Sequence, residues 1–349
     1  MHATALSPDD LHAEFAGAEG YLAACSTGLP SRATRAAIIA DLDARPDLHH
    51  YAAVAERCRA HFARLVSTAP ERVALGSQTS VMVGILAASL PEGATVLCPE
   101  GEFSSLVLPF VHAGRGIRVR AVPLADLAEA VDAAVDLVAF SIVQSATGEV
   151  ADAAAIAASS RRHGARTLCD ATQAAGWLPV DASMFDALVC HTYKWLCTPR
   201  GLTFLALDDE YAAALAPIHA GWYAGEDPWA ACYGADASLA ASARRFDVSP
   251  AWQATVGAEP ALALFADADA SALHARVTGL ARVFREKLGL PEPLRPTPIV
   301  TWPDPAGADL SRLTAAGIVA SGRRGNARLA FHVFNDDGDV DLAVRALRA

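Results

Sequence analysis

The chain has 349 residues, of which 53% are hydrophobic and 19% are charged, and its 28 basic against 39 acidic side chains give a net charge of −11. This length predicts one large domain and a smaller lobe, and the negative charge, without a Lys/Arg cluster, argues against nucleic-acid binding. The apolar excess comes mainly from alanine and predicts no membrane segment, because no run approaches roughly 18 uninterrupted apolar residues.

Short apolar runs alternate with longer alanine-rich stretches between about residues 50 and 210. The runs predict strands over 72–76, 95–99, 117–123, 137–143, 166–170, 187–191 and 202–207. Between these strands, helical periodicity predicts helices over 81–90, 104–113 and 151–163. Continuous apolar strands that alternate with helices indicate a sheet covered on both faces, and ligands bind at the carboxyl ends of the strands of such sheets.

The regular alternation ends after residue 208. Residues 220–235 are rich in Gly, Trp, Tyr and Asp, which predicts an ordered loop. Helices are predicted over 251–266 and 271–288, and short strands with a terminal helix over 340–348 predict a compact α+β lobe. We therefore expect an N-terminal segment over 1–19 that packs on the small domain, a large domain over 20–245 and a small C-terminal domain over 246–349.

The cysteines and the N-terminal residues bear on the compartment. Seven cysteines, odd in number and mostly in apolar runs, are typical of reduced, buried thiols: Cys25, Cys58, Cys98, Cys169, Cys190, Cys197 and Cys232. No CxxC pair is present, so we expect no metal site. The first 17 residues carry three acids and no basic stretch, which argues against a signal peptide. A cytoplasmic protein is the expectation.

The stretch 168–201 carries the most chemical information. Asp170 ends one apolar strand, and Lys194 follows the next one 24 residues later. A lysine and a carboxylate at adjacent strand ends suit pyridoxal 5′-phosphate (PLP) chemistry, in which the lysine forms a Schiff base and the buried acid keeps the pyridine nitrogen protonated. The alternative is that Asp170 caps a helix and Lys194 is an ordinary surface lysine.

The chain resembles the class V aminotransferase family of fold-type I PLP enzymes over nearly its whole length, with local matches to kynureninase and the carbon–sulfur lyase branch. The residues that match the family pattern are Asp170, Gln173, Gly176, Pro179, Asp181 and Lys194. The resemblance implies that Lys194 is the Schiff-base lysine, that Asp170 partners the pyridine nitrogen and that Gln173 neighbours the ring hydroxyl. It also implies a large three-layer α/β/α domain with a mostly parallel sheet, and a small α+β C-terminal domain.

Further cofactor-binding positions follow from the same resemblance. Thr79 and Ser80 open a helix after a strand and resemble a phosphate-binding turn of kynureninase, although either could be a plain helix cap. Phe103 falls where the family places the residue that stacks on the cofactor ring, with a core phenylalanine as the alternative. His191 and Tyr193, just before Lys194, are expected to face the phosphate, with a histidine satisfied at a strand end as the alternative for His191.

Two more positions concern the partner subunit and the substrate. Trp222 resembles a kynureninase tryptophan that reaches the phosphate of the partner subunit, which implies a homodimer with shared active sites. A packing anchor is the alternative. Arg328 lies in an alternating strand-like segment and resembles the family arginine that binds the substrate α-carboxylate. A surface arginine is the alternative for Arg328, and Arg323 and Arg324 rank below it for this role.

The sequence narrows the set of candidate reactions but does not select one, because one cofactor adduct supports transamination, β-elimination, racemisation and desulfuration. The absence of cysteine after Cys232 argues against persulfide formation. Residues 24–28 depart from the kynureninase pattern, which argues against true kynureninase. We expect an enzyme that acts on a small-molecule α-amino acid through an external aldimine, by transamination or Cβ side-chain cleavage. The alternatives are a C–S β-lyase or a kynureninase-like hydrolase and, ranked last, a non-catalytic protein of the same fold.

Overall fold

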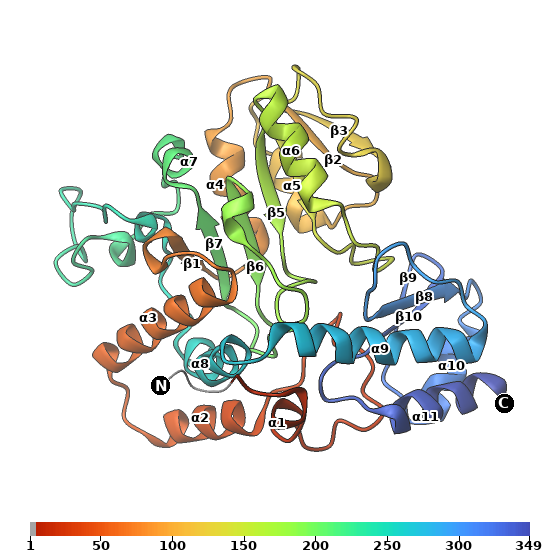
Figure 1. The fold of residues 1–349 in the computed structure, drawn as a ribbon. Coiled ribbons are helices and arrows are strands. Elements are labelled where there is room, and N and C mark those ends of the chain that lie inside the picture. Colours follow the sequence, from red (N-terminus) through yellow and green to blue (C-terminus); the bar gives the residue numbers. More distant parts are fainter. Residues whose placement is uncertain (1–4) are drawn as a thin grey trace.

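A seven-stranded sheet forms the centre of the larger part of the molecule in the computed structural model, which describes residues 5–349 (Figure 1). Its strands are β1 (Val73–Gly76), β2 (Thr95–Pro99), β3 (Arg118–Val122), β4 (Leu137–Ser141), β5 (Arg166–Asp170), β6 (Ala187–His191) and β7 (Thr203–Leu207). The strand order is β1-β7-β6-β5-β4-β2-β3. Strand β7 runs antiparallel to both of its neighbours, and the remaining pairs are parallel.

The strands form where the sequence has continuous apolar runs, because the sheet is covered on both faces. Every residue of β2, β4, β6 and β7 is buried, whereas the edge strand β3 is partly exposed and carries two arginines. Strand β4 ends at Ser141, two residues earlier than predicted, and the Ser141 N–H and hydroxyl there both donate to the carboxylate of Glu102. The predicted α/β class with a mostly parallel sheet is confirmed.

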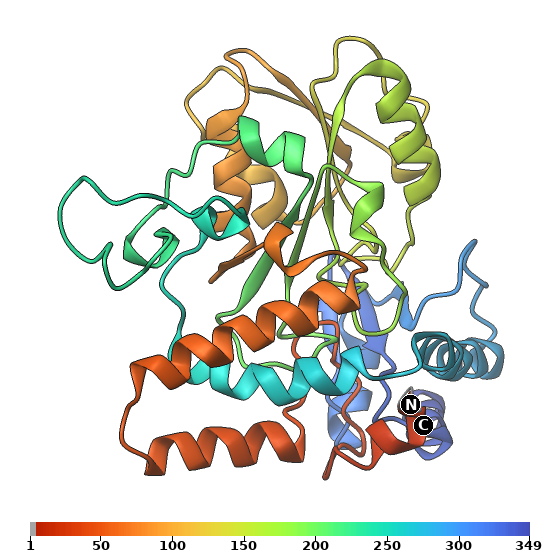
Figure 2. The same ribbon diagram turned by 60° about the vertical axis from the view of Figure 1, so that its left-hand side comes forward.

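Two helical layers cover the sheet, and the alternation of side chains along each strand divides the core between them (Figure 2). On one face lie α4 (Thr79–Ser89), α5 (Ser104–Val111) and α7 (Asp209–Ala214). On the other lie α3 (Leu48–Leu65), α6 (Ala153–His163) and α8 (Trp252–Ala266), and α2 (Arg32–Asp43) packs on α8. In β4, for example, Val138 and Phe140 belong to one core and Leu137 and Ala139 to the other.

A smaller antiparallel sheet lies near the C-terminus, in the order β8-β10-β9. Its strands are β8 (Ile299–Pro303), β9 (Ser321–Arg323) and β10 (Asn326–Ala330), and it has its own apolar core with α9 (Ala270–Leu288), α10 (Ala308–Ala315) and α11 (Asp337–Arg348). The short helix α1 (Pro8–His12) follows Leu6, which pairs with Ala268 just before α9. No helix in residues 5–349 has both the length and the apolar character needed to cross a membrane.

A buried ion pair joins α3 to the chain that leads into α8. The Arg59 guanidinium lies 2.6 Å from the Asp247 carboxylate, and the two side chains are 2% and 0% exposed. Asp247 also accepts a hydrogen bond of 2.7 Å from the Leu75 N–H in β1, and Arg59 donates to the Val73 carbonyl of the same strand. These contacts satisfy both charges and fix α3 against the edge of the sheet.

Removal of one partner of this pair is expected to be strongly destabilising. Arg59→Met leaves the Asp247 carboxylate buried without its cation, which costs about 3–5 kcal/mol. A matched control is Arg72→Met, which breaks the exposed pair with Asp209 (39% and 71% exposed) and costs roughly 0–1 kcal/mol. Urea unfolding followed by circular dichroism measures both, and equal losses of stability would contradict the prediction.

Candidate active site

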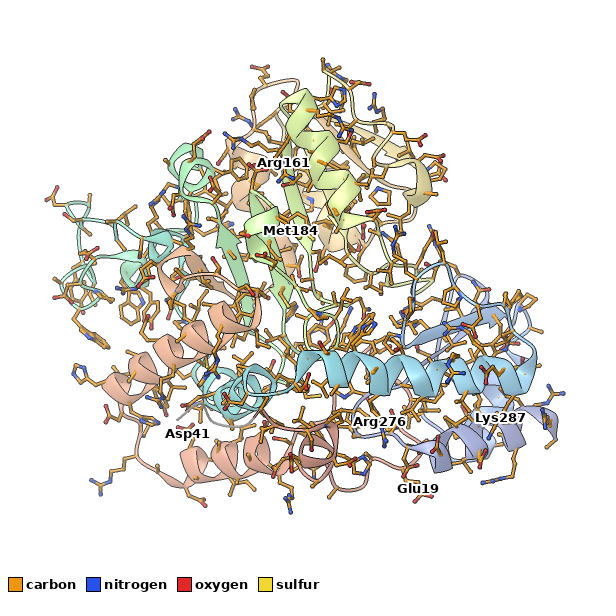
Figure 3. The ribbon with its side chains drawn as sticks, in the orientation of Figure 1. Glu19, Asp41, Arg161, Met184, Arg276 and Lys287 are labelled. Carbon is orange, nitrogen blue, oxygen red and sulfur yellow. The ribbon has the colours of Figure 1, made fainter. Side chains whose placement is uncertain are left out.

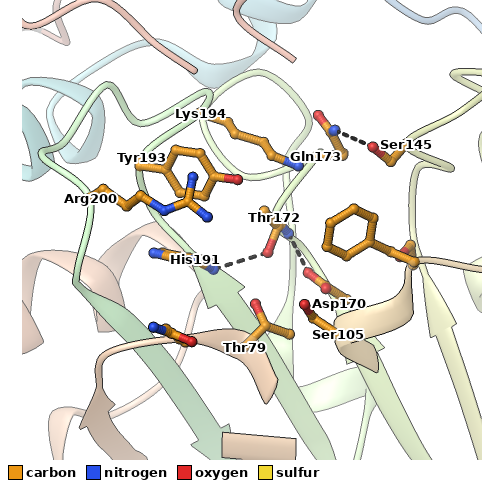
Figure 4. Close-up of a pocket in the computed structure, with 13 residues that line it drawn as sticks. Thr79, Ser105, Ser145, Asp170, Thr172, Gln173, His191, Tyr193, Lys194 and Arg200 are labelled. Atoms are coloured by element: carbon orange, nitrogen blue, oxygen red, sulfur yellow. Dashed lines mark hydrogen bonds between the residues drawn. The ribbon is translucent and has the colours of Figure 1, made fainter. Parts of the chain in front are cut away.

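A cavity opens at the carboxyl ends of the sheet strands, where the sequence predicts a ligand (Figure 4). It contains about 650 Å³ of empty space and is lined by Gln78, Thr79, Phe103, Ser105, Ser141, Ser145, Asp170, Thr172, Gln173, His191, Tyr193, Lys194 and Arg200. Asp170 ends β5, His191 ends β6, and Thr79 begins the helix that follows β1. Seven of the predicted site residues therefore line one cavity: Thr79, Phe103, Asp170, Gln173, His191, Tyr193 and Lys194.

Lys194 lies in the β6–β7 loop and is 4% exposed. Its Nζ lies 5.3 Å from the centre of the Phe103 ring and 5.8 Å from the centre of the Tyr193 ring. Burial lowers the pKa of Lys194 to about 8, against the opposing effect of Asp170. A lysine with this pKa is uncharged in a useful fraction near neutral pH, and the uncharged amine is the nucleophilic form.

The loop that carries Lys194 is fixed by contacts with a segment near the N-terminus, around Gly28. The Gly28 N–H donates to the Tyr193 carbonyl at 2.8 Å. A Cβ atom on Gly28 would lie 2.1 Å from the Lys194 carbonyl oxygen and 2.9 Å from Cys197, so the two backbones approach too closely for any larger residue. Cys197 itself has a φ of 54°, in the left-handed region.

Asp170 supplies the negative charge at the base of the cavity. It is 4% exposed, and one of its oxygens accepts a hydrogen bond of 2.7 Å from the Thr172 N–H. Burial raises the pKa of Asp170 to about 6, against the stabilising hydrogen bonds from Thr172. The carboxylate is therefore mostly ionised at neutral pH, and a protonated ring nitrogen is a suitable partner for it.

Gln173 is held in one orientation by its neighbours. The Trp195 indole N–H donates to its amide oxygen at 2.8 Å, so the amide nitrogen points the other way. That nitrogen donates to the Cys25 carbonyl at 2.9 Å and to the Ser145 hydroxyl at 3.0 Å. The fixed amide lies on the wall of the cavity, where the resemblance expects a neighbour of the ring hydroxyl.

The end of the cavity near Thr79 has the properties of an anion site. The N-cap residue of α4, Gln78, makes no side-chain capping bond, so the first N–H groups of the helix are free to bind an anion. The His191 Nε2 is buried and has no hydrogen-bond partner within residues 5–349. A buried polar atom without a partner is unusual, and a phosphate oxygen would satisfy it. Ser80 follows Thr79 in the helix but does not line the cavity.

Phe103 is positioned by a residue that the sequence analysis missed. The Glu102 carboxylate accepts hydrogen bonds from the Phe103 N–H (2.6 Å), the Ser141 N–H (2.8 Å) and hydroxyl (2.7 Å), and the Gln144 amide (2.8 Å). These bonds tie the loop after β2 to the end of β4. Phe103 is 44% exposed, so its ring lines the cavity with a face free to stack on a planar group. An acid next to an aromatic residue at a strand end was the available signal.

Arg328, in β10, is fully buried and does not itself line the cavity, but it contacts Ser145, which does. Its Nε donates to the Ser321 hydroxyl at 3.1 Å and one terminal nitrogen donates to the Ser26 hydroxyl at 2.9 Å, while the other donates to the Ser145 carbonyl. No carboxylate pairs with it in the described part of the chain, and burial lowers its pKa. A buried guanidinium with only neutral partners is suited to bind a substrate carboxylate.

Trp222 lies apart from the cavity of its own chain. It belongs to a short 3-10 helix, Trp222–Ala224, and its ring packs against Trp229 at 5.3 Å and Tyr223 at 5.3 Å. The segment around it extends away from the sheet in Figures 1 and 2. Arg200, which does line the cavity, was not selected by the sequence analysis. Its signal was a basic residue in the turn between the lysine loop and β7.

The residues of the cavity fit PLP on two independent observations. The partnerless His191 Nε2 and the uncapped start of α4 mark a place for the phosphate. Asp170 and Lys194 are buried around the same cavity and supply the acid and the amine that the ring requires. Both ends of the cofactor thus have chemically matched groups.

Comparison with known proteins agrees with this geometry. The family model "Aminotransferase class-V" matches residues 45–295. An isopenicillin N epimerase of Amycolatopsis lactamdurans is 29% identical over 187 residues, which cover 47% of this chain and 46% of the relative. An uncharacterized aminotransferase of Bacillus subtilis, YcbU, is 37% identical over 120 residues, which cover 34% of this chain and 31% of the relative. These matches therefore span less than half the length of these curated relatives.

Solved structures share the fold over nearly the whole chain. The cysteine desulfurase CsdA of Escherichia coli superposes with a TM-score of 0.84 at 19% identity and covers 98% of each chain. The cystine C–S lyase C-DES, in complex with cysteine persulfide, gives 0.84 at 21% identity and covers 95% of this chain and 98% of its own. At these identities the likeness concerns the fold. The family model matches more than half of the sequence and confirms the resemblance, and the chain belongs to the aminotransferase class-V family of PLP-dependent enzymes.

Proposed function

We propose that this protein holds PLP through Lys194 and acts on an α-amino acid at Cα, by transamination or by cleavage of the side chain at Cβ. The observation that carries the proposal is the buried amine of Lys194 in one cavity with the buried carboxylate of Asp170. The guanidinium of Arg328, which has no carboxylate partner in residues 5–349, contacts Ser145 in the wall of this cavity. Family membership supports the cofactor and the class of reaction.

The cofactor-binding residues divide the work along the cavity. PLP, when bound, supplies an electron sink for the bonds at Cα of an amino acid. Asp170 keeps the proton on the pyridine nitrogen, and Phe103 stacks on the ring and excludes water from that face. Gln173 lies beside the ring hydroxyl. Thr79, with the N–H groups that follow it, and His191 donate hydrogen bonds to the phosphate.

The remaining steps belong to Arg328 and Lys194. Arg328 binds the α-carboxylate of the substrate, because it is a buried cation that has no carboxylate partner in the described residues. Lys194, once released, removes and returns the proton at Cα. Its pKa of about 8 lies near neutral pH, which suits a group that must act first as a base and then as an acid.

A second candidate reaction is epimerisation at Cα. Relatives from Amycolatopsis lactamdurans and Streptomyces clavuligerus are named isopenicillin N epimerases, and each matches about half of this chain. Epimerisation uses the same Cα proton and the same lysine. Cleavage at Cβ includes the C–S β-lyase and kynureninase-like reactions. Persulfide formation is not proposed, because no cysteine follows Cys232.

We further propose a cytoplasmic homodimer in which Trp222 serves the active site of the partner subunit. Trp222 lies in a projecting aromatic segment and does not line the cavity of its own chain, which is compatible with a role across an interface. Exposed apolar residues on this segment and on α2 and the start of α3 support an interface in this region: Ile39, Leu42, Leu48, Trp229 and Leu239.

The function is tested by the absorbance of the purified protein with PLP and a panel of amino acids and cysteine S-conjugates. We expect a visible band that Lys194→Ala abolishes, because no other residue takes the place of this amine in the cavity. Conversion to pyridoxamine 5′-phosphate indicates transamination, release of pyruvate or ammonia without it indicates Cβ cleavage, and inversion of the amino acid indicates epimerisation. A yellow, active Lys194→Ala protein would contradict the assignment.

The lowered pKa of Lys194 predicts how attachment of PLP depends on pH. Only the uncharged amine reacts, and its fraction rises with pH until the pKa is passed. The rate of band formation in the apoprotein should therefore increase about tenfold per pH unit below pH 8 and level off above about 8. Stopped-flow absorbance measures this rate, with Nα-acetyl-lysine as a reference for an ordinary lysine side chain, whose rate keeps rising to about pH 10. A continued rise to pH 10 in the protein would show an ordinary lysine.

Replacement of Arg328 is expected to impair substrate binding more than cofactor binding. Arg328→Gln removes the charge but keeps hydrogen-bonding capacity, and loss of a charged hydrogen bond lowers kcat/KM by about 10- to 100-fold. Arg312→Gln, at an exposed position of α10 where the arginine pairs with Asp309, is the control and should change kcat/KM little. Steady-state kinetics and PLP titration separate the two effects. An unchanged kcat/KM in Arg328→Gln would remove this residue from the substrate site.

A further inference from the structure

Apart from Arg200, the groups at the proposed phosphate end of the cavity carry no formal positive charge. A phosphate monoester carries a charge of about −1.5 to −2 at pH 7. Its neighbours here would be His191, the hydroxyl of Thr79 and the N-terminal end of α4. Burial, with the nearby charges of Arg200 and Lys194, lowers the pKa of His191 to about 4, so its ring is neutral at physiological pH. Burying a phosphate against neutral groups alone is costly, because its charge stays uncompensated.

Two other cations, Lys194 and Arg328, are assigned to other parts of the bound molecules. Lys194 is the amine proposed to form the Schiff base with the cofactor. Arg328, on the small sheet, donates four hydrogen bonds, to the hydroxyls of Ser26 and Ser321 and to the carbonyl and hydroxyl of Ser145. Neither is free to serve the phosphate.

Arg200 is a free cation at the required end. It lines the cavity, and its guanidinium carbon lies 4.5 Å from the centre of the Tyr193 ring. It forms no ion pair within residues 5–349. Figure 4 shows its side chain beside Tyr193, on the side of the cavity where His191 lies. Burial and, after it, the charge of Arg200 lower the pKa of His191, whereas burial raises the pKa of Tyr193 and the charge of Arg200 opposes that rise; both effects are consistent with this proximity.

The local backbone explains why the guanidinium is held there. Arg200 lies in a turn between Pro199, with its fixed φ, and Gly201, whose φ of 117° is outside the range of ordinary residues. The segment that contains Lys194 and this turn runs from the end of β6 to the start of β7, so the sheet fixes both of its ends. Stacking on Tyr193 restricts the side chain further, since arginine packs well on aromatic faces.

We propose that Arg200 is the residue that neutralises the phosphate of the cofactor, with its planar guanidinium paired to phosphate oxygens beside Thr79 and His191. The proposal rests on the proposed function, because it assigns a residue to the phosphate of the same cofactor. Tyr193 then acts mainly as the platform that orients Arg200. The phosphate, and therefore Arg200, provides much of the affinity that distinguishes PLP from pyridoxal, which lacks the phosphate.

The test compares PLP and pyridoxal binding to the apoprotein by quenching of tryptophan fluorescence. Arg200→Gln should weaken PLP binding about 10- to 100-fold and change pyridoxal binding little, because only PLP carries the anion. Arg200→Lys should fall between the two, since it keeps the charge but loses the bidentate geometry. Arg161→Gln, on the exposed side of α6 (Figure 3), is the charge-matched control and should bind as the unaltered protein does.

A second readout needs no cofactor. Inorganic phosphate should raise the Tm of the unaltered apoprotein and of Arg161→Gln, but not that of Arg200→Gln. An Arg200→Gln protein that keeps the normal ratio of PLP to pyridoxal affinity, and still responds to phosphate, overturns the role of Arg200 alone. Failure of the unaltered protein to bind PLP would instead overturn the proposed function itself, so the two failures are distinguishable.

Discussion

The site depends on keeping two opposite charges, Lys194 and Asp170, out of water at the ends of neighbouring strands. Burial shifts the pKa of each toward neutrality, to about 8 for the lysine and about 6 for the aspartate. Such a pair is costly unless its geometry is fixed. The parallel pairing of β5 with β6, in register from Leu168 to Asp170, provides that rigidity. The surrounding layers of helices exclude water and maintain the shifted values.

The loops around this pair are fixed by hydrogen bonds between elements that are distant in sequence. Glu102 ties the Phe103 loop to β4, and Trp195 fixes the amide of Gln173. Ser145 connects the two parts of the molecule, because its hydroxyl accepts from Gln173 while its carbonyl accepts from Arg328 of the small sheet. A substrate carboxylate at Arg328 would therefore lie one residue from the group expected beside the ring hydroxyl.

Sequence reasoning predicted the strands well because a sheet covered on both faces requires continuous apolar runs, and Asp170 and Lys194 followed from their places at strand ends. It missed Glu102 and Arg200. Glu102 acts through contacts with β4 that form only when the sheet is assembled. The role proposed for Arg200 became visible only when the contacts of the other cations, such as Arg328, were known. The position of Trp222 outside the cavity of its own chain is likewise a property of tertiary packing. Thr79 lines the cavity and the next residue, Ser80, does not, because successive residues of a helix point in different directions.

The contact of Gly28 with the lysine loop has a consequence for how this site can diverge. The same N-terminal segment contributes the Ser26 hydroxyl to Arg328 and the Cys25 carbonyl to Gln173, so it contacts two residues of the proposed site. Gly28 is constrained by close backbone contact, because a Cβ atom there would collide with the Lys194 carbonyl and with Cys197. New substrate preferences can therefore arise at the residues just before it, by exchange of side chains, without loss of the reactive amine. A library for altered specificity would vary positions 25–27 and leave position 28 unchanged.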